Sequence, residues 1–281
     1  MSAAVRLSAF GDEISDDLQV QIDTLAGLNV HFLELRGAWG KNVLELDDDE
    51  VQTVRQSCER AGLAVSAIGS PIGKSPLAAP FENELGNLVR SFEIASALGV
   101  TFIRVFSFYP PENAGPGSEA DLVDESARRL SVLAARAANE GITLLLENEK
   151  GIVGDTIPQC HALLQAVDSP DLRFAWDPAN FVQVGEMAAT EDGWPLLGPY
   201  VAHVHVKDAL ANGDVRPAGE GAGQVDLLLD RLRDCGYAGF LALEPHLAIA
   251  GHSTGFSGVD GMAHAVEVLR SLMAARNLPE E

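Results

Sequence analysis

The segment "AANEGITLLLEN", residues 137–148, joins the end of a helix to a buried strand through a single glycine. Alanine-rich sequence favours helix before Gly141, and glycine fits the left-handed backbone that usually follows a helix end. The run "ITLLL" is apolar without alternation, which is typical of a parallel strand buried on both faces. Glu147 follows this run directly, so a carboxylate is expected at the buried end of the strand, where it needs a compensating charge.

The same pattern of helix end, glycine and apolar strand recurs along the chain. It is found in "LAGLNVHFLEL", "CERAGLAVSAIG", "ASALGVTFIRVF" and "RDCGYAGFLALE", with glycines at Gly27, Gly62, Gly99 and Gly236. The glycines at 27, 62, 99 and 141 are 35, 37 and 42 residues apart. This is the length of one helix, one strand and two loops, so the pattern predicts repeated βα units.

Eight βα units predict an α/β fold, a (β/α)8 TIM barrel that forms a single domain over residues 1–281. A doubly wound open sheet is disfavoured because no GxGxxG follows the first strand. Helices are expected at Asp16–Leu28, Asp47–Gly62, Ala120–Glu140 and Asp260–Arg276. The eight strands are expected near Arg6–Phe10, Phe32–Leu35, Ala64–Ile68, Phe102–Phe106, Thr143–Leu146, Arg173–Trp176, Ala202–Val206 and Leu241–Leu243.

Composition narrows the class of protein. Lys and Arg total 19 and Asp and Glu total 41, a net charge of −22, which disfavours binding to nucleic acid phosphates and to anionic membranes. The three cysteines, Cys58, Cys160 and Cys235, are scattered, so we expect reduced packing residues. The N-terminal sequence has no apolar run of signal-peptide length and no stretch is long enough to cross a bilayer, so a cytoplasmic protein is expected.

Acidic and histidine side chains stand at the ends of four consecutive predicted strands. Glu147, Asp177, His205 and Glu244 are 30, 28 and 39 residues apart, about one βα unit each. Because the carboxyl ends of barrel strands build one mouth, we expect these four side chains to meet there. Taken singly, each has a simpler interpretation, such as a helix cap or a core histidine, and we keep the latter for His203.

Three carboxylates in one buried site need a counter-charge. A divalent cation supplies it, and oxygen ligands with one imidazole suit Mn²⁺ or Mg²⁺, with Co²⁺ or Zn²⁺ as alternatives. The sequence therefore predicts one divalent metal ion at the barrel mouth.

The motifs "LLLEN", "WDPAN", "HVHVKD" and "LALEP", in this order, resemble the xylose-isomerase-like TIM-barrel superfamily. The resemblance runs from "FGDEIS" to the last helix, and the family includes ketose 3-epimerases, hydroxypyruvate isomerase, inosose isomerases and dehydratases, and the endonuclease IV group. It implies a metal held by Glu147, Asp177, His205 and Glu244. It also implies that Glu147 and Glu244 form the catalytic acid/base pair.

Further polar residues near the predicted mouth are candidates for binding substrate. The epimerases carry Asp-x-x-His after the sixth strand, but this chain has Asn180, which forms hydrogen bonds without titrating. Arg216 lies in the loop where those epimerases have a substrate-binding arginine. Lys207, Glu34 and His246 complete the set, although Lys207 could form an ion pair instead, and Glu34 and Arg36 could neutralise each other.

The resemblance and the candidate site imply a metal-dependent isomerase or epimerase for a small keto-sugar, sugar acid or cyclitol. The reaction would proceed by proton abstraction next to a carbonyl, through a metal-bound enediolate. The alternative is a lyase on the same site, either a keto-inositol dehydratase or a 3-oxo-glycoside or C-glycoside deglycosidase. An endonuclease IV-like nuclease and a non-enzymatic sugar-binding barrel are remoter alternatives. The expected partner is a small carbohydrate, and analogy suggests a homo-oligomer.

Overall fold

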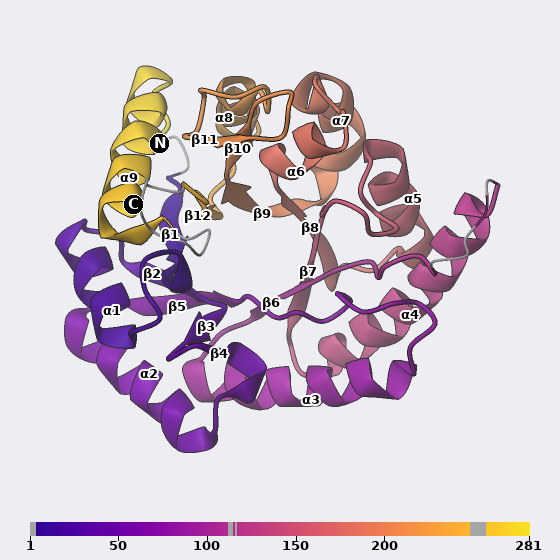
Figure 1. Ribbon diagram of the computed structural model, residues 1–281, viewed down its shortest axis with the longest axis horizontal. Coiled ribbons are helices and arrows are strands. Elements are labelled where there is room, and N and C mark those ends of the chain that lie inside the picture. The colour runs from indigo at the N-terminus through magenta and orange to yellow at the C-terminus, as the bar shows by residue number, and fades with distance from the viewer. Residues whose placement is uncertain (1–3, 112–114, 116, 248–256) are drawn as a thin grey trace.

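A closed barrel of eight parallel strands forms the centre of the molecule in the computed structural model, which describes residues 4–111, 115, 117–247 and 257–281. The strand order is β1-β12-β9-β8-β7-β6-β5-β2, and helices ring the barrel (Figure 1). The barrel strands are β1 (Arg6–Phe10), β2 (Phe32–Leu35), β5 (Ala64–Ile68), β6 (Phe102–Val105), β7 (Thr143–Glu147), β8 (Leu172–Trp176), β9 (Val201–Val206) and β12 (Phe240–Leu243).

The predicted TIM barrel is confirmed, and every predicted strand is present. The bounds of β1, β2 and β5 match the prediction, and those of the other five differ by one residue. One of these differences concerns the site, because β7 extends to Glu147, which pairs with Ala175 of β8. The carboxylate therefore stands on the last residue of the strand rather than in the following loop.

The helices of the ring follow the barrel strands along the chain. They are α1 (Leu18–Gly27), α2 (Asp48–Ala61), α3 (Phe81–Leu98), α4 (Glu119–Asn139), α5 (Ile157–Val167), α6 (Pro178–Gln183), α7 (Ala189–Leu197), α8 (Val225–Asp234) and α9 (Gly258–Ala275), with 3-10 turns η1 (Gly11–Glu13), η2 (Val43–Glu45) and η3 (Gly198–Tyr200). Gly62 and Gly99 are left-handed C-caps, as predicted. The same expectation for Gly27 is wrong, because Gly27 ends α1 and Asn29 takes the left-handed backbone instead.

The main apolar core lies between the barrel and its helices and contains most of the buried aliphatic side chains. A separate small apolar cluster consists of Ala67, Leu145 and Ala175, with Phe102 and Ala202 packed against it. Buried polar side chains fill much of the remaining interior, among them Ser8 and Ser66, whose hydroxyl oxygens lie 2.6 Å apart. The barrel is thus lined with polar groups below the carboxyl ends of its strands.

Two short hairpins follow barrel strands at this end. β3 (Gly37–Ala38) pairs with β4 (Lys41–Asn42), and β10 (Asp208–Ala209) pairs with β11 (Val215–Arg216). The loop after β11 is held by the Asp208 carboxylate, which accepts hydrogen bonds from the backbone N–H groups of Gly219, Gly221 and Gly223.

The ends of the described chain also meet, because Val5 forms a parallel bridge with Glu280. The three cysteines are free thiols, as expected, but only Cys58 and Cys160 are buried; Cys235 is exposed, so the expectation that it is a packing residue is wrong. Among the described residues, no helix is both long enough and apolar enough to cross a membrane.

Candidate metal centre

A cavity of about 200 Å³ opens where the barrel strands end. This volume is below the roughly 300–1,000 Å³ that is usual for drug-sized ligands, so the cavity suits a small molecule. Both basic and acidic side chains line it. Its lining residues are Arg36, Lys74, Arg104, Glu147, Glu149, Lys150, Asn180, Gln183, Lys207, Val215, Glu244 and His246.

The four predicted metal ligands lie together at this cavity, with Glu147 and Glu244 in its lining. Glu147, Asp177, His205 and Glu244 each offer a ligand atom, and these atoms all lie within 4.8 Å of one another. All four residues are buried. Four adjacent barrel strands, β7, β8, β9 and β12, place them by ending at the same level of the barrel. The arrangement could hold a metal ion.

The donor set fits a divalent cation. Within the described residues, Glu147 Oε2, Asp177 Oδ2 and His205 Nδ1 are buried atoms with no hydrogen-bond partner. Unsatisfied buried polar atoms are costly, so three of them on three neighbouring side chains point to a shared ligand. Lys207 Nζ lies 2.8 Å from Asp177 Oδ2, at ion-pair distance but outside hydrogen-bond geometry. The Lys207 ammonium group therefore already pairs with carboxylates of this cluster.

The pKa shifts in the cluster reflect burial opposed by neighbouring charge. Burial raises the pKa of Asp177, and the carboxylates of Glu147 and Glu244 add to this effect. Burial also acts to raise the pKa of Glu147, but the charges of His205 and Arg104 outweigh it and lower that pKa. Burial disfavours the charged form of His205, yet the adjacent carboxylates raise the pKa of its imidazole. The pKa of each carboxylate in the cluster thus depends on the positive charge beside it.

Local hydrogen bonds fix the ends of β7 and β8. The backbone N–H of Asp177 donates to Asn148 Oδ1, and Asn148 Nδ2 donates to the Asp177 carbonyl, both at 2.9 Å. Asp177 Oδ1 caps α6 by accepting the backbone N–H of Asn180, which leaves Oδ2 directed into the cluster. The side chain of Asn180 donates to Glu147 Oε1 at 3.3 Å. Asp177 is therefore both a helix cap and a member of the cluster.

Glu34 occupies a different place from the one expected for a substrate-binding residue. It is fully buried below the cavity, and both its oxygens face histidines, at 2.7 Å from His203 Nε2 and 3.2 Å from His205 Nε2. The suggested pairing of Glu34 with Arg36 is wrong, because Arg36 binds other carboxylates. His203 is the buried core histidine that was expected.

Arg104 and Glu13 were not singled out by the sequence, and Arg36 was considered only as a partner of Glu34. Arg36 pairs with Asp12, Glu13 and Glu244, and so links the ends of β1, β2 and β12. Arg104 on β6 lies 3.3 Å from Glu147 Oε2. A single arginine inside the apolar strand sequence "FIRVF" was the available signal for Arg104. Glu13 belongs to the "FGDEIS" motif, but nothing in the sequence indicates its partner.

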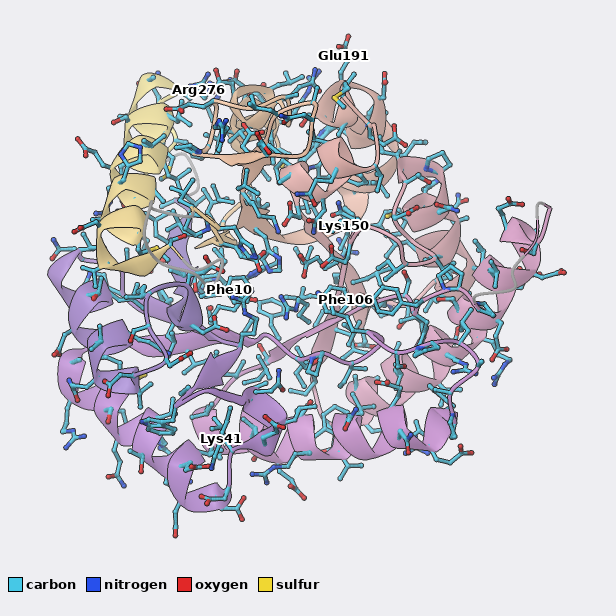
Figure 2. All side chains as sticks on the ribbon, viewed as in Figure 1. Phe10, Lys41, Phe106, Lys150, Glu191 and Arg276 are labelled. Atoms are coloured by element: carbon cyan, nitrogen blue, oxygen red, sulfur yellow. The ribbon has the colours of Figure 1, made fainter. Side chains whose placement is uncertain are left out.

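Phe10 and Phe106 make cation–π contacts with Arg104 and Lys74. The guanidinium of Arg104 lies 5.3 Å from the ring centre of Phe10 and 4.8 Å from that of Phe106, and Lys74 Nζ lies 4.4 Å from the Phe106 ring. Figure 2 shows Phe10, Phe106 and Lys150 near the centre of the ring of helices. Phe106 is fully buried, so its ring is covered by the surrounding side chains.

The remaining candidates lie at the edge of the site or outside it. His246 lines the cavity, and its Nδ1 lies 3.1 Å from Glu13 Oε1. Lys74 pairs with Glu149 at 2.8 Å on the cavity wall. Arg216 is absent from the cavity lining, and its guanidinium instead lies 3.8 Å from the Asp214 carboxylate in its own hairpin.

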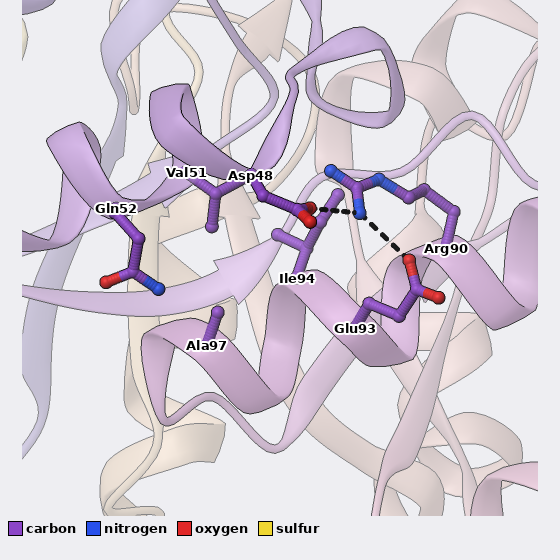
Figure 3. Close-up of a pocket in the computed structure, with 7 residues that line it drawn as sticks. All are labelled: Asp48, Val51, Gln52, Arg90, Glu93, Ile94 and Ala97. Atoms are coloured by element: carbon purple, nitrogen blue, oxygen red, sulfur yellow. Dashed lines mark hydrogen bonds and ion pairs between the residues drawn. The ribbon is translucent and has the colours of Figure 1, made fainter.

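A second cavity, of about 310 Å³, lies on the outer surface between α2 and α3 (Figure 3). Arg90 bridges Asp48 and Glu93 there at 2.8 Å each. Exposed ion pairs of this kind contribute little stability, about 0–1 kcal/mol each. These ion pairs link α2 to α3 on the surface. The candidate catalytic site is therefore the cluster at the barrel mouth.

Comparisons with known proteins assign the family. The family model described as xylose isomerase-like TIM barrel matches residues 22–272. The chain belongs to this family. The family assignment agrees with the resemblance seen in the sequence motifs. No curated protein matches the chain by sequence.

Solved structures of the family share the fold at low identity. The IolI protein with a bound zinc atom aligns with a TM-score of 0.79 at 15% identity, covering 97% of this chain and 99% of its own. A D-tagatose 3-epimerase-like protein aligns with a TM-score of 0.77 at 18% identity, covering 97% and 98%. The probable 3-DHS dehydratase AsbF from Bacillus anthracis aligns with a TM-score of 0.71 at 20% identity, covering 95% and 98%. Identities this low establish the fold alone.

Proposed function

We propose that this member of the xylose isomerase-like family is a divalent-metal-dependent isomerase or epimerase. Its substrate would be a small keto-sugar, sugar acid or cyclitol, and the reaction would move a proton next to a carbonyl. The observation that carries the proposal is the buried cluster of Glu147, Asp177, His205 and Glu244 under a small cavity. Carboxylate and imidazole donors at the mouth of a TIM barrel suit a metal site.

Mn²⁺ or Mg²⁺ is the proposed ion, because three of the four donor residues are carboxylates. Co²⁺ and Zn²⁺ are alternatives, and zinc is bound in the related IolI structure. A cation held there would polarise the substrate carbonyl and stabilise negative charge on its oxygen.

Glu147 and Glu244 are the proposed acid/base pair. They stand at the ends of β7 and β12, which β8 and β9 separate, so the two carboxylates approach a molecule in the cavity from different sides. One would accept the proton next to the carbonyl, and the other would deliver a proton to the planar intermediate. Asn180 would orient Glu147 through its 3.3 Å contact, and Lys207, 3.1 Å from Glu244 Oε2, would stabilise an enolate oxygen.

Substrate binding would draw on the cavity wall. His246 lines the cavity and would contact substrate directly, whereas Arg216 would reach it only if its hairpin moved. The net charge of −22 supports a small-molecule substrate rather than nucleic acid, and so argues against a nuclease. A homo-oligomer in the cytoplasm remains part of the proposal by analogy with the family.

A lyase is the second candidate, and the position of Lys207 favours it. Its ammonium nitrogen lies between Asp177 and Glu244, where it could donate a proton to a departing oxygen after the same proton abstraction. The family neighbour AsbF is titled a probable dehydratase. The two reactions differ in mass balance, because an isomer keeps the mass of the substrate whereas a lyase product loses water or a leaving group.

The proposed function is tested by incubating the Mn²⁺-loaded protein in D₂O with keto-sugars, keto-inositols and 3-oxo-glycosides. Proton NMR and mass spectrometry of the products should show an isomer, with deuterium incorporated next to the carbonyl. The Glu147→Gln variant is the control and should be inactive. A product lighter by water or an aglycone would replace the isomerase by the lyase. No turnover of any class, together with no metal binding, would indicate a non-enzymatic barrel.

A further inference from the structure

The Glu34 carboxylate spans the barrel interior beneath the candidate metal centre. It starts on β2 and reaches two histidines on β9, with β1 and β12 between these strands in the barrel order. Its side chain has no exposed surface. Oε2 lies 2.7 Å from His203 Nε2 and Oε1 lies 3.2 Å from His205 Nε2, so each oxygen serves one imidazole. Glu34 therefore cannot touch a substrate in the cavity.

This contact determines how His205 presents its ring. In the neutral form that binds a metal ion, an imidazole that donates its Nε2 proton to a carboxylate keeps its free lone pair on Nδ1. His205 Nδ1 lies 3.1 Å from Glu147 Oε1, on the side where the other three donor residues gather, and it has no hydrogen-bond partner among the described residues. Glu34 thus leaves the nitrogen that faces the cluster available to bind a cation.

Ring packing fixes the same orientation. The His205 ring stands edge-on to Phe10, with ring centres 5.0 Å apart, and edge-on to His203, with ring centres 5.1 Å apart. His203 in turn holds the second oxygen of Glu34. A flipped His205 ring would place Cε1 where Nε2 now faces Glu34 and Cδ2 where Nδ1 now faces Glu147, so both contacts would be lost.

We infer that Glu34 is a positioning residue that sets the tautomer and orientation of His205, so that Nδ1 is the nitrogen that binds the divalent cation. This inference rests on the proposed function, because it requires a metal at the cluster. Carboxylates that hold the distal nitrogen of a metal-binding histidine commonly strengthen metal binding about 10–100-fold. Glu34 itself does not bind the ion.

The first test compares Mn²⁺ affinity in the wild type, Glu34→Gln and Ser66→Ala, with free Mn²⁺ followed by electron paramagnetic resonance. Glu34→Gln keeps the shape of the side chain but loses one acceptor oxygen, so we expect binding about 10–100-fold weaker. Ser66→Ala removes the buried Ser8–Ser66 hydrogen bond of the same barrel interior without touching either histidine, and should bind Mn²⁺ like the wild type.

The outcomes separate this inference from the proposed function. Wild-type and Glu34→Gln affinities within twofold of each other would overturn the positioning role and leave the metal centre intact. An equal loss in both variants would also overturn it, because it would reflect general damage to the barrel interior. A wild type that binds no Mn²⁺ would overturn the proposed function itself, and the inference with it.

A second test needs no variant and so stands even if Glu34→Gln fails to fold. Nitrogen NMR of the histidine-labelled wild type loaded with Zn²⁺ distinguishes the two ring nitrogens of His205. We expect Nδ1 coordinated and Nε2 protonated. Coordination through Nε2, with the proton on Nδ1, would overturn the inference.

Discussion

Lys207 and Asp177 face each other at the ends of β9 and β8, with Nζ of the lysine 2.8 Å from Oδ2 of the aspartate. The same ammonium lies 3.1 Å from Oε2 of Glu244. Both carboxylates belong to the proposed metal centre, so Lys207 and a divalent cation would seek the same oxygens. Metal binding would therefore have to displace or repel this lysine.

Replacing Lys207 by methionine should tighten Mn²⁺ binding. The change keeps the length of the side chain but removes the competing positive charge. At an effective dielectric constant of about 20, two unit charges 4 Å apart repel by about 4 kcal/mol. Because the lysine can move away, we expect a smaller effect, a gain in affinity of about tenfold, which corresponds to about 1.4 kcal/mol. Isothermal titration calorimetry would measure it.

Lys150→Met is the matched control for this experiment. Lys150 lines the same cavity but is exposed, so its removal should change Mn²⁺ affinity less than about twofold. Weaker binding in Lys207→Met would contradict the competition and would make Lys207 a support of the metal centre.

Asp208→Asn should loosen the loop between β10 and α8. The Asp208 carboxylate accepts hydrogen bonds from three loop glycines, and a Cβ on Gly221 or Gly223 would lie 2.2 or 2.7 Å from Asp208 Oδ1. An amide would replace one acceptor oxygen by a donor facing backbone N–H groups. We expect the free energy of unfolding to fall by about 2 kcal/mol, and hydrogen exchange to quicken in residues 210–224.

Asp214→Asn provides the control within the same loop. The exposed Asp214 side chain accepts a hydrogen bond from Asn212 Nδ2 at 3.0 Å and lies 3.8 Å from Arg216, away from the three glycines that Asp208 holds. The exchange rates of this variant should match the wild type. Unchanged exchange in Asp208→Asn would mean that backbone packing alone holds the loop.

Thiol reactivity should distinguish the three cysteines of the folded protein. Burial raises the pKa of the Cys58 thiol to about 11 and raises that of Cys160 as well, so little thiolate forms at pH 8 in either. Cys235 is exposed. A disulfide reagent such as DTNB should titrate one thiol at pH 8 in native protein and three in denaturant. Rapid reaction of two or three native thiols would contradict the burial.

The fold was largely readable from the sequence because its signals are local. Apolar runs without alternation located every barrel strand to within a residue, and glycines such as Gly62 and Gly99 marked helix ends through their backbone conformation. The left-handed residue predicted at Gly27 is instead Asn29, two residues later, because asparagine also tolerates a left-handed backbone.

The site was readable only where residues follow a strand in register. Glu147, Asp177, His205 and Glu244 obey this spacing and do come together. The role of Glu34 depends on a contact across the barrel with His203 and His205, 169 and 171 residues away, which no local pattern encodes.

The central claim is that four strand-end residues hold one divalent cation, and the most direct test is a Mn²⁺ titration of the wild type against Glu147→Gln. We predict one ion per wild-type chain and at least about 100-fold weaker binding in Glu147→Gln, because an amide is a weaker ligand without charge. Glu149→Gln, two residues further on at the cavity wall, should bind like the wild type. Absence of Mn²⁺ binding in the wild type, or equal affinity in Glu147→Gln, would contradict the account.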